Sequence, residues 1–444
     1  MIAHHFPPAG GSGSNRALAF ARYLPAYGWR PFVLTPGARW AINRDDGLLA
    51  EIPSGLRVIR THSFEPRPRV PPLPLGEAAR SAGEGWVRDF NVREDTHPSP
   101  QPSPRGRGGP LRRHLGHLKR FPDAHIGWLP FALMAASRVR YDVAYSSSGP
   151  FTSHLVGLLL KRRTGRPWVA ELRDGWYRWN RAVFPDYPAW RDPLERRLEA
   201  AALRSADRVV LVTDRMASAF RRQYADLAPE HFAVVPNGFD ATQLAAQPPD
   251  PRNGWEVLHA GALYYGRSLS SFLEAAARLV DADPEFARDF RLTLTGTLDV
   301  SASTELRRTP LGHHVHVSGQ RDHASTIRAM RSADALLLVS NTTPGAEATV
   351  PGKLFEYLAV GRPVLAVAPP DSSTADVLES TGGGRLAPAG DPAAIACVLQ
   401  QAFRERSNPP LPSEVAVARF DRRLLAGDLA CIFDQVVGGA ARRY

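Results

Sequence analysis

Short apolar runs alternate with amphipathic stretches along most of this 444-residue chain. After an opening glycine-rich loop, apolar residues recur at helical spacing, which predicts a helix over 15–27. Runs of three to six mostly apolar residues between turn signals predict buried strands. In the first half, the predicted strands cover 31–35, 56–60, 143–146, 168–172, 208–213 and 233–235, and further helices cover 151–161, 194–204 and 214–224.

The same alternation returns in the second half. The predicted strands there cover 256–260, 291–295, 315–317, 335–339 and 364–368, and the predicted helices cover 268–280, 323–331 and 352–360. Strands that alternate with helices are typical of mostly parallel sheets with helices on both faces. We therefore expect an α/β protein.

A chain of 444 residues exceeds what one hydrophobic core usually covers. We predict an N-terminal domain over 1–245 and a C-terminal domain over 246–418, joined near the proline-rich stretch 245–254. A last helix within 419–444 is expected to pack back onto the first domain. Ligands of open α/β sheets bind at the carboxyl ends of the strands, so a cleft is predicted where the two sheets face each other.

Residues 65–120 interrupt this pattern. Prolines and glycines crowd 96–109, and they exclude a regular helix or a central strand. We predict a disordered insertion without a role. The alternative is an arm that contacts the acceptor or a membrane.

The chain has two cysteines, too few for a disulfide framework or a cysteine-based zinc site. No signal peptide is visible, and no apolar run reaches the roughly 18 to 20 residues that a membrane-spanning helix needs. A reducing cytoplasm is therefore the expected compartment.

The positive charge is concentrated in the first half. Residues 1–250 carry 35 Lys and Arg against 23 Asp and Glu, a net charge of +12, whereas residues 251–444 carry 20 against 21, a net charge of −1. This asymmetry favours an anionic partner such as a membrane surface or a phosphate-bearing acceptor. Nucleic acid is not expected, because no basic stretch is interleaved with aromatic residues. Solvated surface arginines are the alternative explanation.

The most informative segment is 350–366, which is predicted to be a loop, a helix and a Gly-Arg-Pro turn into a strand. Lys353 and Glu356 lie three apart and therefore on one helix face. A helix N-terminus attracts phosphate, and a carboxylate one turn further can accept hydrogen bonds from ribose hydroxyls. The alternative is a surface helix with a Lys353–Glu356 salt bridge.

Two loops offer further anion contacts. Gly11 and Gly13 lie before the first helix, where glycines allow backbone N–H groups to approach a ligand closely, although Arg16 fills the third position of the GxGxxG pattern. Arg267 follows the first strand of the second half, where its guanidinium could neutralise a diphosphate. A ligand-free turn and a solvated arginine are the alternatives.

A fourth segment follows the predicted strand 168–172. Glu171, Arg173, Asp174 and Trp176 are expected to face the cleft on the acceptor side, with Asp174 positioning a hydroxyl or stabilising positive charge. The alternative is an ion pair of Arg173 with Asp174 or Glu171.

Together these segments resemble glycosyltransferase family 4, the retaining nucleotide-sugar enzymes of the GT-B fold. The residues that carry the resemblance are 6–29, 148–176, 235–240 and 353–366. The resemblance implies two Rossmann-like domains whose parallel sheets face each other across a cleft, with the acceptor in the first and the nucleotide-sugar in the second. It implies no cofactor and no obligatory metal.

The resemblance also assigns roles to residues. Arg267 and Lys353 would hold the diphosphate, Glu356 the ribose, and Arg321 would lie beside the base. The loop with Gly11 and Gly13 would face the donor. With Asp174, the residues Arg267 and Lys353 form the expected catalytic set.

The sequence departs from the family at two places. Many members carry two glutamates eight positions apart; Ala348 stands at the first position and Glu347 is one residue away. Glu171 stands where relatives often have Asp. We expect retaining transfer of a sugar to a cell-envelope polysaccharide, lipopolysaccharide or glycolipid acceptor, with peripheral contact to the inner membrane face. An inactive GT-B partner protein and a GT-B sugar-nucleotide epimerase are the alternatives, ahead of a phosphorylase or a dehydrogenase.

Overall fold

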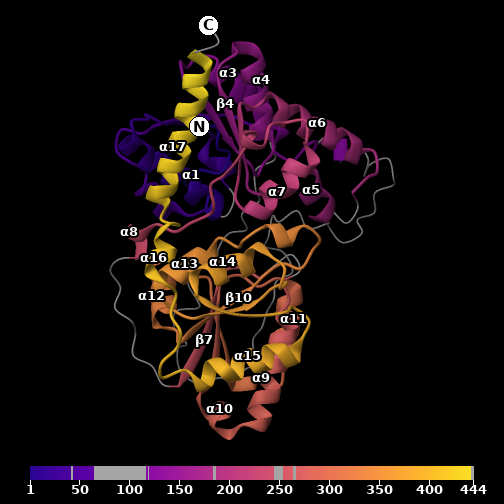
Figure 1. Cartoon of the computed structure of the whole chain (residues 1–444), viewed down its shortest axis with the longest axis vertical. Coiled ribbons are helices and arrows are strands. Elements are labelled where there is room, and N and C mark those ends of the chain that lie inside the picture. Colours follow the sequence, from indigo (N-terminus) through magenta and orange to yellow (C-terminus); the bar gives the residue numbers. More distant parts are fainter. Residues whose placement is uncertain are drawn as a thin grey trace.

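The computed structural model describes residues 1–41, 44–64, 117–118, 120–183, 187–244, 254–263 and 267–441. Two α/β bodies follow one another along the long axis of the molecule (Figure 1). The predicted insertion over 65–120 and the linker over 245–254 lie almost entirely outside the described residues.

The sheet of the N-terminal body is parallel. Strands β3 (Ala144–Ser147), β4 (Trp168–Leu172), β5 (Arg208–Leu211) and β6 (Phe232–Val234) pair in that order, and β1 (Phe32–Pro36) pairs with β2 (Arg57–Thr61). Ile2 connects the two sets, because it forms bridges to both Leu34 and Ser146. Its amide donates to the Tyr145 carbonyl at 2.7 Å, so the opening residues act as a short central strand.

Helices pack on this sheet and on one another through buried apolar side chains. The helices are α1 (Ser12–Tyr23), α3 (Leu129–Ala136), α4 (Thr152–Thr164), α5 (Trp176–Val183), α6 (Arg191–Ser205), α7 (Asp214–Gln223) and the short α8 (Ala241–Leu244). Leu155, Trp168 and Phe220 lie in one of the resulting cores. Helices α3 and α5 were not predicted from the sequence.

The C-terminal body has a six-stranded sheet in the order β12-β11-β10-β7-β8-β9, and every pair is parallel. The strands are β7 (Trp255–Ala260), β8 (Phe290–Thr295), β9 (Val315–Gly319), β10 (Ala335–Val339), β11 (Val364–Val367) and β12 (Gly384–Ala387). The helices are α9 (Ser270–Ala282), α10 (Pro284–Asp289), α11 (Val300–Arg308), α12 (His323–Ser332), α13 (Lys353–Val360), α14 (Ser373–Thr381), α15 (Pro392–Arg404) and α16 (Glu414–Ala418).

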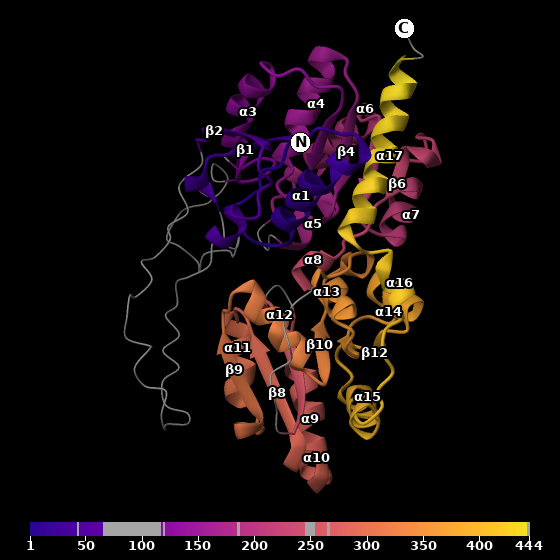
Figure 2. The ribbon, with the colours of Figure 1, turned by 90° about the vertical axis from the view of Figure 1, so that its left-hand side faces the viewer.

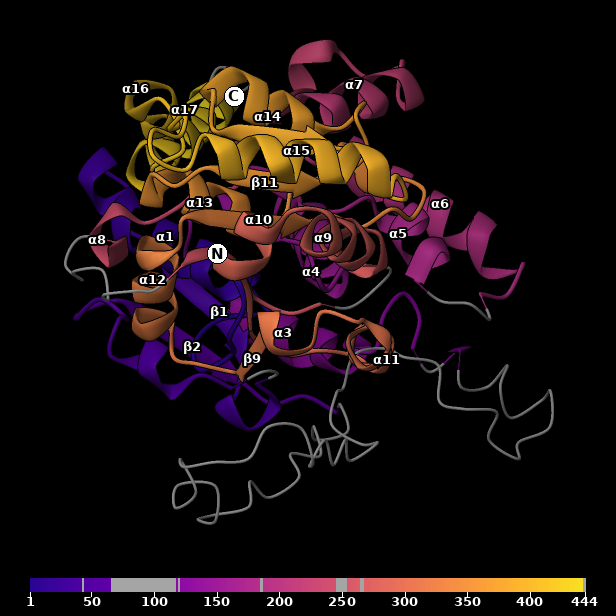
Figure 3. The same ribbon diagram turned by 90° about the horizontal axis from the view of Figure 1, so that it is seen from below.

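Both faces of this sheet are covered. Helices α9 and α15 lie side by side on one face, where Phe272 and Leu399 share a core (Figure 3). Leu354 and Phe355 of α13 lie in a core on the other face. The predicted α/β class with two Rossmann-like bodies is therefore confirmed. The sequence did not predict α10, α11, α14, α15, α16 or β12.

The last helix, α17 (Arg422–Ala441), runs along the N-terminal body beside α1 (Figure 2). Its Leu425, Leu429 and Phe433 share a core with Phe20 and Leu24. The chain thus crosses between the bodies a second time, and the two crossings meet where the Phe239 amide donates to the Phe420 carbonyl at 3.1 Å. Within the described residues, no helix combines the length and apolar character needed to cross a bilayer.

Candidate active site

The carboxyl ends of the two sheets face each other. Thr213, just after β5, donates its hydroxyl to the carbonyl of Ala348 in the loop after β10 at 2.5 Å. Arg215 pairs with Asp376 at 2.5 Å and with Asp371. Ser12 lies 3.6 Å from where a Cβ on Gly352 would be, so the glycine-rich loop meets the N-terminus of α13.

Lys353 is the first residue of α13, and its ammonium lies beside a buried histidine. Lys353 Nζ is 3.1 Å from His259 Nε2, and His259 Nδ1 is 2.9 Å from the Leu337 carbonyl. A carbonyl only accepts, so Nδ1 carries the proton and Nε2 accepts from the lysine. The fully buried imidazole is therefore neutral, and burial together with the Lys353 charge keeps its pKa well below the usual value.

The same surroundings lower the pKa of Lys353. Burial, and then the charge of Arg267, lower the pKa of Lys353 from 10.5 to about 7, while Glu356 opposes the shift. Within the described part of the chain, Lys353 forms no salt bridge. The ammonium is thus partly desolvated without a neutralising contact, which is typical of a residue that binds an anion.

Gly261 makes room for this ammonium. A Cβ at Gly261 would lie 2.8 Å from Lys353 Nζ, and the backbone there has φ of 116°, which other residues rarely adopt. Glycine is therefore required where β7 ends beside the lysine.

Arg267 connects the two bodies electrostatically. Its charge lowers the pKa of Lys353 in one body and opposes the burial-driven rise in the pKa of Asp174 in the other. It also donates weakly to the Ala262 carbonyl at 3.4 Å. The structure thus brings together the three predicted residues Arg267, Lys353 and Asp174; residues 264–266 of the predicted loop lie outside the described residues.

Arg173 lies against the glycine-rich loop. Its Nε donates to the Ser148 carbonyl at 2.7 Å, and its Nη2 is 2.7 Å from where a Cβ on Gly13 would be. Gly13 is therefore needed for this close approach. Gly11 caps α1 with a φ of 94°, and its carbonyl accepts from the Asn15 amide at 3.2 Å.

Glu171 and Trp176 do not face the other body as predicted. Both are fully buried. Glu171 Oε1 accepts from Arg16 Nη2 at 2.7 Å, and Trp176 stacks on Phe151 with ring centroids 5.0 Å apart. The reason is that β4 is buried along its whole length, so a carboxylate on it needs an internal cation.

The remaining predicted residues lie further from the lysine or in separate loops. Glu356 is half-buried on the first turn of α13, and its charge opposes the fall that burial causes in the pKa of Lys353 and of buried Arg422. Arg321 is exposed in the loop between β9 and α12. Glu347 accepts from the Gly345 amide at 2.8 Å, so in this structure it stabilises its own loop.

Two residues of this region were missed from the sequence. His259 holds Lys353, and Arg422 begins α17 close to Glu356 and Asp240. The available signal for His259 was a polar side chain inside an otherwise apolar strand. Arg422 carried no such signal, because only the return of the chain places it there.

Two family models match the sequence. One, described as glycosyltransferase family 4, matches residues 87–243, and the other, described as glycosyl transferases group 1, matches residues 255–405. The matches fall on the two bodies that hold Asp174 and Lys353. The chain therefore combines a domain of glycosyltransferase family 4 with a domain of the group 1 glycosyl transferases.

Several solved structures have a similar fold. A sucrose-phosphate synthase from Thermosynechococcus elongatus is 17% identical with a TM-score of 0.64, covering 99% of this chain and 98% of that one. WaaB, a lipopolysaccharide outer core galactosyltransferase, is 12% identical with a TM-score of 0.57, covering 97% and 98%. WaaG, a glycosyltransferase involved in lipopolysaccharide biosynthesis, is 14% identical with a TM-score of 0.53, also covering 97% and 98%.

At these identities the solved structures establish the GT-B fold of this glycosyltransferase. A search of curated proteins found no match to its sequence. The family implies a nucleotide-sugar donor and an acceptor.

Proposed function

We propose that this glycosyltransferase transfers a hexose from a nucleotide-sugar to a glycan or lipid-linked acceptor, with retention of configuration. The observation that supports it most is the ammonium of Lys353, held by His259 and flanked by Arg267, opposite Asp174 of the other body. This arrangement is suited to a diphosphate between the two bodies.

The proposed chemistry uses the cations directly. Lys353 and Arg267 bind the diphosphate and stabilise the negative charge that develops on it as the glycosidic bond breaks, a term that is commonly the largest in catalysis. Glu356 accepts hydrogen bonds from the ribose, Arg321 lies beside the base, and Gly11 and Gly13 face the donor. Asp174 positions the acceptor hydroxyl, whose proton passes to the departing phosphate on the same face. No metal is required, because the side-chain cations balance the diphosphate.

The test is transfer of labelled sugar from a panel of UDP-, GDP- and ADP-sugars. Lys353→Ala should lower kcat by roughly two to three powers of ten, as expected for loss of one preorganised donor. The anomeric configuration of the product, measured by NMR coupling, checks retention. Nucleotide binding without transfer would instead favour the inactive GT-B partner protein, and isomerised donor without acceptor would favour the epimerase.

We further propose an acceptor of the cell envelope, reached at the inner face of the membrane. The +12 net charge of residues 1–250 supports contact with an anionic surface. The lipopolysaccharide enzymes among the similar folds favour the same setting. Co-sedimentation with anionic vesicles should occur at low salt and weaken as salt rises; absence of binding at low salt would contradict this part of the proposal.

A further inference from the structure

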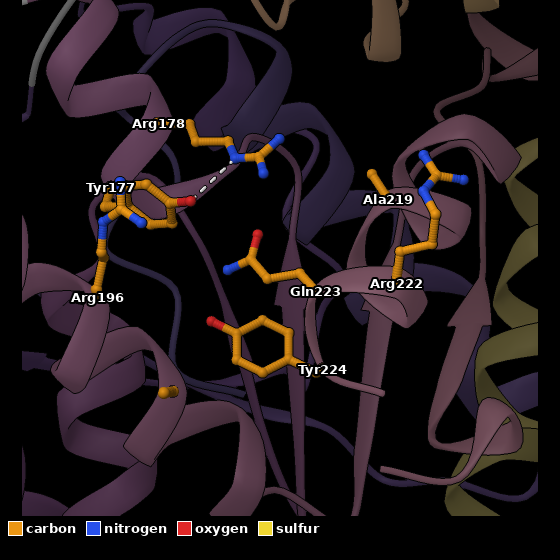
Figure 4. Close-up of a pocket in the computed structure, with 8 residues that line it drawn as sticks. Tyr177, Arg178, Arg196, Ala219, Arg222, Gln223 and Tyr224 are labelled. Carbon is orange, nitrogen blue, oxygen red and sulfur yellow. Dashed lines mark hydrogen bonds between the residues drawn. The ribbon is translucent and has the colours of Figure 1, made fainter. Parts of the chain in front are cut away.

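A pocket of about 510 Å³ lies in the N-terminal body and includes none of the residues assigned above to the donor. Helices α5, α6 and α7 each contribute one arginine to its wall (Figure 4). The side chains that decide its chemistry are Tyr177, Arg178, Arg196, Arg222, Gln223 and Tyr224.

A buried carboxylate beneath the pocket is already satisfied. Glu199 is 1% exposed, and it accepts from the Tyr224 hydroxyl at 2.6 Å and from the Gln223 amide at 3.2 Å. The backbone amide of Tyr177 adds a third contact at 3.3 Å. Neutral groups thus supply the hydrogen bonds of Glu199, and its charge acts on Arg178 only through space.

The three arginines are held in different ways. Arg178 Nε donates to the Tyr177 hydroxyl at 3.1 Å, and the Arg196 guanidinium lies 4.5 Å from the centre of the Tyr177 ring. Arg196 also pairs with Asp192 at 2.6 Å. Arg222 is exposed and makes no hydrogen bond or ion pair with any described residue. Three cations thus surround the pocket, against the partly exposed carboxylate of Asp192 and the buried carboxylate of Glu199.

This excess of charge selects the ligand class. Guanidinium groups match phosphate and carboxylate oxygens with paired hydrogen bonds. A carboxylate is balanced by one cation, whereas a phosphate or diphosphate carries enough charge to engage more than one. The volume is within the range of small-ligand pockets.

The pocket adjoins the acceptor side of the proposed active site. Helix α5 begins two residues after Asp174, and a Cβ on Gly175 would lie 3.8 Å from the Arg178 Cβ. Arg178 thus lies on the first turn of the helix that starts two residues after Asp174, so one short segment connects the pocket to Asp174.

We propose that this pocket binds a phosphate or diphosphate group carried by the acceptor. The identification of the ligand as the acceptor rests on the proposed glycosyl transfer, whereas binding of the anion does not. The anion belongs either to a soluble sugar phosphate or to a lipid headgroup.

Calorimetric titration with inorganic pyrophosphate, in the presence of saturating UDP or GDP to fill the donor site, tests the pocket. The Arg178→Gln/Arg222→Gln variant should bind pyrophosphate at least about tenfold more weakly, because the loss of two charge-assisted hydrogen bonds together contributes at least that much. Arg197→Gln is the control for removal of an arginine charge, since Arg197 is exposed on α6 and does not line the pocket; it matches the single variant Arg222→Gln charge for charge. Pyrophosphate binding that is absent, or equal in the double variant, overturns the proposal.

Two further comparisons complete the design. If the double variant is unfolded by circular dichroism, Arg222→Gln alone replaces it, with an expected loss of roughly threefold or more. Weaker binding of hexose 1-phosphate alone identifies a soluble source, and weaker co-sedimentation with phosphatidylglycerol vesicles identifies a lipid source. The two proposals fail in different ways. If the protein binds no nucleotide but its pyrophosphate affinity still depends on the two arginines, the proposed glycosyl transfer is wrong and the anion pocket stands. If sugar transfer is normal but the double variant binds pyrophosphate as the parent does, only the pocket proposal is wrong.

Discussion

Two desolvated cations of this protein lie in opposite electrostatic situations. Arg16 in the N-terminal body donates to Glu171 at 2.7 and 2.9 Å and to the carbonyls of Val235 and Pro236 at 2.8 and 2.6 Å. Lys353 in the C-terminal body contacts a neutral histidine and is repelled by Arg267. The first cation is fully balanced from within the protein, whereas the second lacks an anion in contact. Balanced charge of this kind holds α1, β4 and the exit from β6 together, and unbalanced charge indicates where a ligand binds.

The largest expected effect comes from breaking the balanced pair. Glu171→Gln leaves the buried Arg16 without its counter-charge and should lower the free energy of unfolding by about 3–5 kcal/mol. Urea unfolding at pH 7 measures this. Because Arg16 lowers the pKa of Glu171, the stabilisation is present above the unfolded pKa and is lost as pH falls through the folded one.

The control for this substitution is Asp289→Asn, which removes the partly exposed ion-pair partner of the exposed Arg288 and should leave the urea midpoint nearly unchanged. The Arg16→Met/Glu171→Gln double variant should recover part of the loss. An unfolding curve of Glu171→Gln that matches the parent would show that the pair is not structural.

Removing Lys353, the unbalanced cation, should change the free energy of unfolding in the opposite direction. Lys353→Met is expected to raise the free energy of unfolding of the ligand-free protein by about 1–2 kcal/mol at pH 7, because a desolvated ammonium is removed. The pKa of Lys353 is about 7 in the folded state against 10.5 otherwise, so the unfolded state binds more protons between these values. The gain should therefore be complete below about pH 7 and vanish as pH approaches 10.5.

The measurement is thermal or urea unfolding of both proteins across this pH range. A variant that is less stable than the parent at pH 7 would show that Lys353 is a structural cation. The same variant should have lost nucleotide-sugar turnover.

A smaller effect should follow from releasing the lysine. His259→Leu removes the acceptor at Nε2, so the Lys353 side chain loses its fixed position, and the Kd of a nucleoside diphosphate should rise by roughly tenfold. Titration calorimetry gives the affinity. The Kd of His259→Gln, which keeps an acceptor, should lie between those of the parent and of the leucine variant. Equal Kd values for all three proteins would show that His259 has no role in donor binding.

The smallest expected signal is proton uptake. A diphosphate beside Lys353 should raise its pKa above the value of about 7 in the free protein, so binding at pH 8 should take up a fraction of one proton. Calorimetry in buffers of different ionisation enthalpy counts this proton. Uptake should fall towards zero below about pH 6 and should be absent in Lys353→Met.

The sequence by itself determined the α/β class, most of the strands and the segment with Lys353 and Glu356. These follow from local signals: apolar runs, the glycines and prolines that mark turns, and the spacing of residues along one helix. The same signals did not separate Glu171 from Asp174, because both lie at the end of one strand and only the burial of β4 directs Glu171 inward to Arg16.

Only the tertiary structure decided which charges meet. Arg16 and Glu171 are 155 positions apart, and Lys353 and His259 are 94 apart, so no local pattern connects them. The pocket of Arg178, Arg196 and Arg222 likewise requires three helices to come together. Coulomb energy depends on distance and solvent exposure in space, and both are set by packing rather than by position along the chain.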